Sequence, residues 1–202
     1  MAEVVYVMVD FQFFSQLEYR SIGGASWIVS FLGLFEGVLS TFQVATQWFA
    51  SSRLVEKIGV FGTASILPVG VVALGLFSLI GGATGLFTIF IGFLILRFLD
   101  ELFHYTLIET TGTVLFQPLP ENIRSDIQTL VNGVFEPLST GLSGIGILLL
   151  LWLINLFLPD GVPEGIFLQD QSLIFVVTII LLAFVWLWVV WKIRSQYVRL
   201  LV

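Results

Sequence analysis

The sequence predicts an all-α integral membrane protein, a single domain formed by a bundle of six transmembrane helices. Of the 202 residues, 57% are hydrophobic and only 11% are charged, and the mean hydropathy is +1.04. Soluble globular domains are more polar than this. The hydrophobic residues form long continuous runs, whereas the strands of a membrane β-barrel alternate in hydrophobicity over about ten residues. Because a spanning segment must satisfy its backbone internally, these runs predict transmembrane helices.

Glycine, proline and charged residues interrupt the apolar runs and set the boundaries of the predicted helices. The expected helices cover residues 1–17, 25–52, 60–80, 84–116, 123–158 and 171–193. The expected breaks fall at residues 18–24, 53–59, 81–82, 117–120 and 159–163. Since the connections are short, neighbouring helices are expected to run antiparallel.

The first predicted helix starts in an apolar stretch without the basic segment of a signal peptide, and it places Asp10 near its middle. We expect its natural start to be missing. The second predicted helix contains Gly33 and Gly37, which are expected to allow close packing. It also carries a polar stripe at helical spacing, made of Glu36, Ser40, Gln43 and Gln47. The third is predicted from its hydrophobic run alone.

The fourth predicted helix contains the most informative residues of the chain. Four ionisable side chains recur at i, i+3, i+4 and i+7 and therefore share one helical face; they are Arg97, Asp100, Glu101 and His104. An ionised side chain near the bilayer centre costs on the order of 3 kcal/mol or more, so this face should point to protein or water. This helix and the next exceed the roughly 20 residues that cross a bilayer, so they should tilt, bend or project.

The fifth predicted helix repeats the polar rhythm of the second, with Asn132, Glu136, Ser139 and Ser143. If these stripes converge with the charged face and with Asp10, they line a polar cleft or form a dense hydrogen-bond network. The sixth predicted helix ends in the run FVWLWVVWK at 184–192. Its Trp and Lys side chains are expected to anchor it at the membrane interface.

The orientation follows from the basic residues, because Lys and Arg close to the membrane stay on the cytoplasmic side. In a six-span topology only Arg20 falls on one side of the membrane, and the other side receives Arg53, Lys57, Arg124, Lys192, Arg194 and Arg199. Both termini are then cytoplasmic. The acidic residues 159–170, which contain no Lys or Arg, fit the outer side.

Several classes of function are excluded by composition. The chain has no cysteine, so disulfides, thiolate metal sites and thiol catalysis are absent. The net charge of −6 and the few scattered basic residues oppose a nucleic-acid partner. No Ser/His/Asp set, metal-ligand spacing or nucleotide fingerprint occurs in the sequence. We therefore expect neither an enzyme nor a bound cofactor.

Four stretches carry a resemblance to a known family: FLGLFEGV at 31–38, WFASSRLVEKIGV at 48–60, LFQPLPENIR at 115–124 and VNGVFEPL at 131–138. In these stretches the chain resembles the C-terminal half of the nucleotide (ATP/ADP) translocases and their bacterial relatives, a branch of the major facilitator superfamily. The resemblance implies one six-helix half of a twelve-helix transporter, with a substrate site between the halves. It also implies a bacterial inner or plastid-type membrane.

The missing half is then a separate polypeptide, a second copy of this chain, or the absent beginning of a longer one. The chain also departs from the family at the residues that would bind phosphates. Members that carry nucleotides have several Lys and Arg residues where this chain keeps only Arg124, with Asp126, Gln128, Asn132 and Glu136 nearby. Such an acidic lining disfavours nucleotide exchange.

Two functions follow. In the first, the chain is a half-domain of a secondary transporter for a small solute. Its carboxylates then bind protons or cations, and Arg97 is their partner or the anchor of an anionic group; the pathway residues are Arg97, Asp100, Glu101, His104, Glu36, Glu136, Asp10, Gln43 and Asn132. In the second, the bundle is a transport-inactive anchor or accessory subunit of a larger membrane complex, and the polar side chains only join helices.

Overall fold

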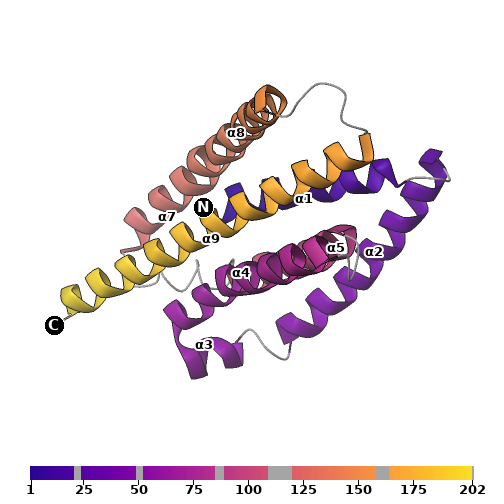
Figure 1. The fold of residues 1–202 in the computed structure, drawn as a ribbon. Coiled ribbons are helices and arrows are strands. Elements are labelled where there is room, and N and C mark those ends of the chain that lie inside the picture. The colour runs from indigo at the N-terminus through magenta and orange to yellow at the C-terminus, as the bar shows by residue number, and fades with distance from the viewer. Residues whose placement is uncertain (21–23, 49–51, 85–88, 109–119, 158–163, 202) are drawn as a thin grey trace.

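The computed structural model describes residues 1–20, 24–48, 52–84, 89–108, 120–157 and 164–201, and these residues fold entirely as helices and short connections (Figure 1). This confirms the all-α fold class. The long helices are α1 (Ala2–Tyr19), α2 (Gly24–Thr46), α4 (Val60–Thr84), α5 (Ile89–Phe103), α8 (Glu136–Phe157) and α9 (Glu164–Leu201). The shorter elements are the α-helices α3 (Ser52–Ile58) and α7 (Glu121–Leu130), and the π-helical turns η2 (His104–Ile108) and η3 (Val131–Phe135).

Four helical segments are long and apolar enough to cross a membrane: Gly24–Thr46, Val60–Gly81, Ile123–Leu156 and Gln171–Gln196. They support a membrane protein. The other two expected spans correspond to α1 and to α5 with η2. α1 carries Glu3, Asp10 and Glu18, whereas α5 has 15 residues and includes the charged face around Arg97. These charges lower their hydropathy, so length and composition alone identify four spans rather than six.

Three expected boundaries were wrong. The break expected at 53–59 is instead helix α3 (Ser52–Ile58), and the chain turns only at Gly59, whose φ of 78° favours glycine. The break expected at Gly81 and Gly82 lies inside α4, because glycine is tolerated within membrane helices. The last helix extends beyond 171–193 at both ends. Residues 109–119 and 158–163, where other breaks were expected, lie outside the described residues.

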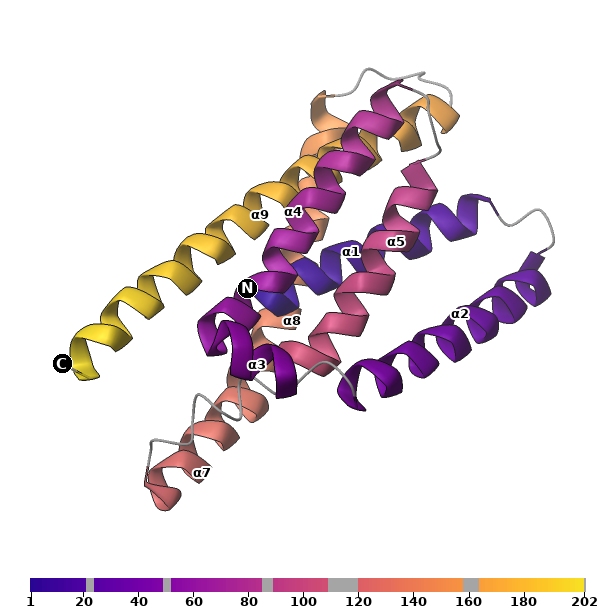
Figure 2. The same ribbon diagram turned by 90° about the horizontal axis from the view of Figure 1, so that it is seen from below.

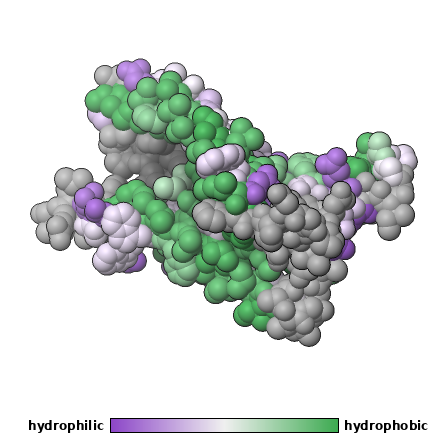
Figure 3. Space-filling model, turned by 45° about the horizontal axis from the view of Figure 1, so that its top comes forward, coloured by the Kyte–Doolittle hydropathy of each residue, from purple (hydrophilic) through white to green (hydrophobic). Residues whose placement is uncertain are grey.

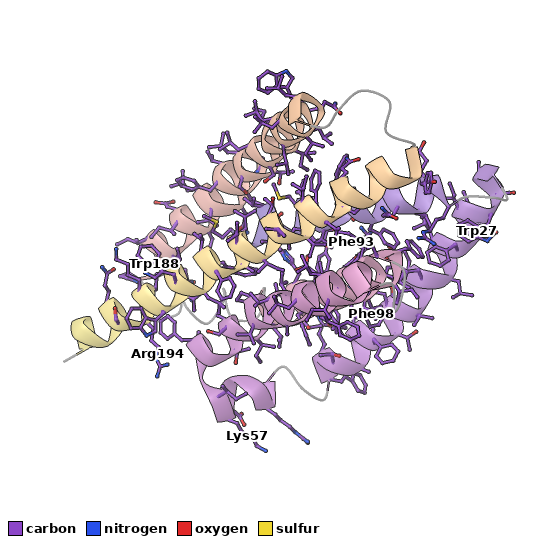
Figure 4. All side chains as sticks on the ribbon, viewed as in Figure 1. Trp27, Lys57, Phe93, Phe98, Trp188 and Arg194 are labelled. Atoms are coloured by element: carbon purple, nitrogen blue, oxygen red, sulfur yellow. The ribbon has the colours of Figure 1, made fainter. Side chains whose placement is uncertain are left out.

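The helices differ in how deeply they are buried. α4 packs against α9 and α5, and α1 is covered by α5, α8 and α9. α2 lies at the edge, where it contacts α5 and η2 (Figures 1 and 2). The largest core cluster includes Val5, Phe93 and Phe175, and Phe93 is seen between the ribbons of α9 and α5 in Figure 4.

α4 and α5 approach each other closely at Gly92. A Cβ atom added there would lie 2.7 Å from the Cβ of Ser78 and 3.3 Å from its Cα. Small side chains at a helix crossing let two backbones come near, as is usual for membrane helices. This contact fixes the position of α5, and with it the charged face that begins five residues later at Arg97.

The outer surface is strongly hydrophobic. In the view of Figure 3, hydrophobic side chains cover much of the described surface, and hydrophilic ones form small separate groups. Exposed large side chains lie along α2 and α8, among them Leu34, Phe42, Leu148 and Trp152. In water such surfaces would drive association, whereas in a bilayer they face lipid.

Basic residues gather toward one end of the bundle. In both ribbon views α3, α7 and the C-terminal part of α9 lie toward one end, whereas the end of α1 and the start of α2 lie toward the other (Figures 1 and 2). Lys57 and Arg194 are seen near the first end in Figure 4, and Arg20 ends α1 at the other. Lys192 Nζ also lies 4.7 Å from the ring centroid of Trp188, as expected of an interfacial anchor.

Candidate functional site

The candidate site is centred on Arg97 of α5, whose side chain is almost fully buried. The guanidinium pairs with Asp10 of α1. Its Nη2 lies 3.5 Å from Glu36 Oε1 of α2 and 3.4 Å from Glu101 Oε2 one turn along α5. Arg97 therefore joins three helices through its charge, and α5 itself supplies one of its partners.

Aromatic rings surround the same guanidinium. Its central carbon lies 4.9 Å from the ring centroids of both Phe13 and Phe14, and 6.0 Å from that of Phe35. A cation is attracted to the face of such rings, and the attraction is stronger where water is excluded. The rings also lower the local dielectric constant, which strengthens the ion pairs of Arg97.

A second polar contact lies about two helical turns beyond Arg97, just after the end of α5. His104, the first residue of η2, has its Nε2 atom 3.2 Å from Glu3 Oε1 of α1, and its ring centroid is 5.5 Å from that of Tyr6. Both ionisable side chains are partly exposed, 19% for His104 and 23% for Glu3. This pair therefore connects the buried ion pairs around Arg97 with the surface of the bundle.

Asp100 lies between these two groups on the same helical face. Its exposed fraction is only 2%. Neither of its carboxyl oxygens has a hydrogen-bond partner within the described residues. Buried polar atoms are nearly always hydrogen-bonded in folded proteins, so this carboxyl group is unusual.

Together these residues form what we term the charged cluster, made of Glu3, Asp10, Glu36, Arg97, Asp100, Glu101 and His104. Its carboxyl groups outnumber its basic groups, so the cluster is acidic overall. Helical periodicity accounts for the assembly, since the α5 members follow the spacing i, i+3, i+4 and i+7. On α1, Glu3 and Asp10 are seven residues apart and therefore share the face turned to α5.

A neutral hydrogen-bond network adjoins the cluster. Gln16 Nε2 of α1 donates to Ser172 Oγ of α9 over 2.7 Å, and Ser172 Oγ donates to Gln12 Oε1 over 3.2 Å. All three residues are buried. Such bonds join membrane helices and contribute about 0.6 kcal/mol each on average.

The structure places the sequence-predicted residues in two groups. Arg97, Asp100, Glu101 and His104 meet Asp10 and Glu36, so these six lie together. The other three lie apart from Arg97: Gln43 is half-buried on α2, whereas Asn132 and Glu136 are exposed on η3 and α8. Glu136 still interacts electrostatically with His104.

The two serines in the polar stripe of the fifth expected span form hydrogen bonds within their own helix. Ser139 Oγ donates to the backbone carbonyl oxygen of Glu136, and Ser143 Oγ to that of Ser139. Hydroxyl groups in membrane helices commonly donate their hydrogen bond to a backbone carbonyl oxygen of the same helix. The hydroxyl groups of this stripe are therefore bonded within their own helix, whereas Glu136 interacts electrostatically with His104.

Sequence reasoning missed several contributors to the site. Glu3 and Tyr6 could have been found from their spacing with Asp10 along α1. The rings of Phe13, Phe14 and Phe35 give no separate signal, because the chain has 20 phenylalanines. Within the described ranges, no three His, Asp or Glu residues are grouped so that they could hold a metal ion.

Comparison with known proteins adds no relative. No protein-family model matches the chain, and neither the curated proteins nor the solved structures contain a match.

Proposed function

We propose that this chain is one half of a secondary transporter for a small solute, and that the charged cluster is its proton or cation site. The observation that carries the proposal is the meeting of charges from α1, α2 and α5 inside an apolar bundle. Ionisable residues are costly in a membrane and usually mark a substrate or ion pathway. A cluster contributed by several helices is also sensitive to their relative movement.

The charge balance supports an ion site rather than a structural clamp. A clamp needs only as many carboxylates as cations, because a surplus buried charge destabilises the protein. The charged cluster holds the buried carboxyl groups of Asp100 and Glu101 in addition to the closest partner of Arg97, Asp10. An acidic surplus of this kind is stabilised by a bound proton or cation.

Arg97 is better explained as the partner of these carboxylates than as an anchor for an anionic solute. Its guanidinium is already surrounded by Asp10, Glu36 and Glu101, and by the phenylalanine rings. A phosphate would have to displace these carboxylates and remain beside them. The cluster therefore supports a neutral or cationic solute, and we do not propose nucleotide exchange.

The topology belongs to the same proposal. We infer six spans in which α1 and α5 cross the membrane as inner helices, in a half-bundle like those of the major facilitator superfamily. In this proposal both termini lie on the cytoplasmic side, and the membrane is a bacterial inner or plastid-type membrane. The gathering of Lys57 and Arg194 toward one end of the bundle supports this orientation.

A complete transporter needs a second half, which is another polypeptide, a second copy, or a further part of the same chain. The exposed hydrophobic faces of α2 and α8 offer surface for lipid and for such a partner. Alternating access then consists of one half rocking against the other around a central site.

A second function, that of an anchor or accessory subunit without transport activity, is favoured by a different observation. The Gln12, Gln16 and Ser172 network and the ion pair between Arg97 and Asp10 can both act as fixed connections between helices. The large exposed apolar surface would then bind neighbouring subunits permanently.

The deciding experiment combines purification with a solute screen. The native protein is solubilised with its partners, and its thermal stability is measured with amino acids, sugars and nucleotides. Stabilisation by a neutral or cationic solute, followed by its uptake into proteoliposomes, supports transport. A fixed complex that no solute stabilises supports the anchor, and stabilisation by ADP contradicts the exclusion of nucleotides.

The matched variants are Glu36→Gln in the charged cluster and Asp126→Asn on the exposed face of α7. Glu36→Gln should abolish uptake while leaving the assembly monodisperse, because the amide keeps the shape but loses the charge. Asp126→Asn should transport normally. Unchanged uptake by Glu36→Gln combined with Asp10→Asn would contradict the proposed role of the cluster.

A further inference from the structure

We propose that Asp100 is a proton-binding group, whose carboxyl is protonated in the arrangement described here and releases its proton when α5 is exposed to water. Its use in coupled transport rests on the proposed function. The protonation itself concerns only this residue and its surroundings, so it can be tested separately.

The first argument is the isolation of the carboxyl group. Asp100 is 2% exposed, and within the described residues neither oxygen accepts a hydrogen bond. An ionised carboxylate in such a place has lost its hydration and received no donor in return, which is very unfavourable. A neutral carboxylic acid avoids most of this penalty.

The second argument concerns the charges that face Asp100 from each neighbouring element. On α5 and η2 these are Arg97, Glu101 and His104, and α1 adds Glu3 and Tyr6. Three further carboxylates act on the basic groups: Asp10 of α1 and Glu36 of α2 lie beside Arg97, and Glu136 of α8 interacts with His104. Tyr105 of η2 is exposed. α4 contains no ionisable residue. Arg97 and His104 favour an ionised Asp100, whereas Glu101 and Glu3 oppose it.

The two basic groups are already committed to other carboxylates. Arg97 pairs with Asp10 and Glu101, and His104 pairs with Glu3. Their positive charge is therefore largely balanced before Asp100 is considered. What remains around Asp100 is a hydrophobic and acidic environment, in which a proton is the simplest compensating charge.

A proton fits this position better than a metal cation. Cations such as Na⁺ or Ca²⁺ need several oxygen ligands, about six to eight in the case of Ca²⁺. No group of three His, Asp or Glu residues suited to a metal is found where the structure describes the chain. A proton needs only one oxygen of the Asp100 carboxyl.

The neighbouring residues also provide a connection to the surface. His104 lies one helical turn from Asp100, and it contacts Glu3 at 3.2 Å. Both His104 and Glu3 are partly exposed. His104, charged beside Glu3, can first give its Nε2 proton to Glu3, and the neutral imidazole can then accept the proton that leaves the Asp100 carboxyl at Nδ1, so that one proton moves from Asp100 to Glu3 and onward to water.

The test is infrared spectroscopy of the purified complete protein, with its native partners, in lipid nanodiscs. A protonated carboxyl has a C=O stretching band that is separate from the bands of carboxylates. At neutral pH we expect one such band in the wild type, its loss in Asp100→Asn, and its retention in the control Asp126→Asn. Absence of the band in the wild type, or its persistence in Asp100→Asn, would overturn the proposal.

A chemical measurement covers the case in which Asp100→Asn fails to fold. Hydrophobic carbodiimides react with protonated carboxyl groups in membranes, and the labelled peptide is identified by mass spectrometry. In the wild-type protein we expect label at Asp100 that decreases as the pH rises. Label confined to other carboxyls, or label at Asp100 that Na⁺ or Ca²⁺ suppresses at constant pH, would overturn the proton assignment.

These measurements separate the two proposals. A protonated Asp100 in a protein that no solute stabilises and that transports nothing would leave the proton assignment intact and contradict the transport function. Transport by a protein whose Asp100 carries no proton would do the reverse.

Discussion

The inner helices α1 and α5 and the outer helices α2 and α8 follow opposite rules for polar residues. α1 and α5 bury charged and amide side chains such as Gln12, Arg97 and Asp100. Of the most apolar 18 residues of α2, only 11% are buried. In the helical segment that contains α8, the corresponding share is 17%. Polar side chains are therefore gathered in part of an otherwise hydrophobic interior, and the outer surface is apolar, as expected when the solvent is lipid.

This difference indicates which interactions stabilise the protein. The interior depends on paired charges and hydrogen bonds, because these groups have no alternative partner in lipid. The outer side chains are surrounded by lipid that is as apolar as they are, so replacing them changes little. Substitutions on the inner helices should therefore be costly, and matched substitutions on the outer helices should be nearly neutral.

The largest effect is expected for Arg97→Gln. Removing the arginine leaves the largely buried Glu101 without its cation and also deprives the partly exposed Asp10 and Glu36 of theirs, which should destabilise the protein by about 3–5 kcal/mol. Equilibrium unfolding in mixed detergent micelles measures this change, with the exposed Arg53→Gln as the control. Adding Asp10→Asn should restore part of the loss, and a double variant less stable than Arg97→Gln would argue against the pairing.

A Leu96→Ala substitution should come next, at about 2–5 kcal/mol, because Leu96 is 3% exposed in the core of α5. The matched outer substitution is Leu148→Ala on α8, where the side chain is 68% exposed. It should change stability by no more than about 0.5 kcal/mol. Equal effects of the two substitutions, in the same unfolding assay, would remove the distinction between inner and outer helices.

Gly92→Ala should cost about 1–3 kcal/mol, since the added methyl group meets Ser78 on α4. The control is Gly141→Ala on α8, where no atom lies within 4 Å of the added Cβ. Thermal denaturation of both variants gives the comparison. Stability should return when Gly92→Ala is combined with Ser78→Gly, and no rescue would mean that another contact is responsible.

The smallest of these effects is expected for Ser172→Ala, at about 1 kcal/mol, because it removes both hydrogen bonds that join α9 to Gln12 and Gln16. Ser139→Ala on α8 is the control, since that hydroxyl bonds only to its own helix. Unfolding free energies of the two variants that agree within error would indicate that the α1 to α9 network contributes nothing.

Periodicity predicted the charged face of α5 because four ionisable residues at helical spacing leave little freedom. It also identified Asp10 and Glu36 as residues that need a partner. It could not determine which way a stripe points, so the stripe that begins with Asn132 and Glu136 looked equivalent although these two residues are exposed. The direction of a face is decided by packing between helices, which local spacing does not contain.

The helix boundaries show the same limit. Glycine and charge mark both true ends and helix interiors, so Gly81 was mistaken for a break while Gly59 ends α3. The Gln12, Gln16 and Ser172 network could not be predicted either. Ser172 lies 156 positions from Gln16 and 160 positions from Gln12 in the chain.

The ion pair between Asp10 and Arg97 has a consequence for biogenesis. α1 is synthesised before α5, so the cation that compensates its partly buried aspartate arrives only after α2, α3 and α4 have left the ribosome. A helix with an uncompensated charge partitions poorly into lipid. α1 should therefore remain beside the translocation machinery until α5 emerges. Stable insertion of α1 into the membrane then depends on the synthesis of α5.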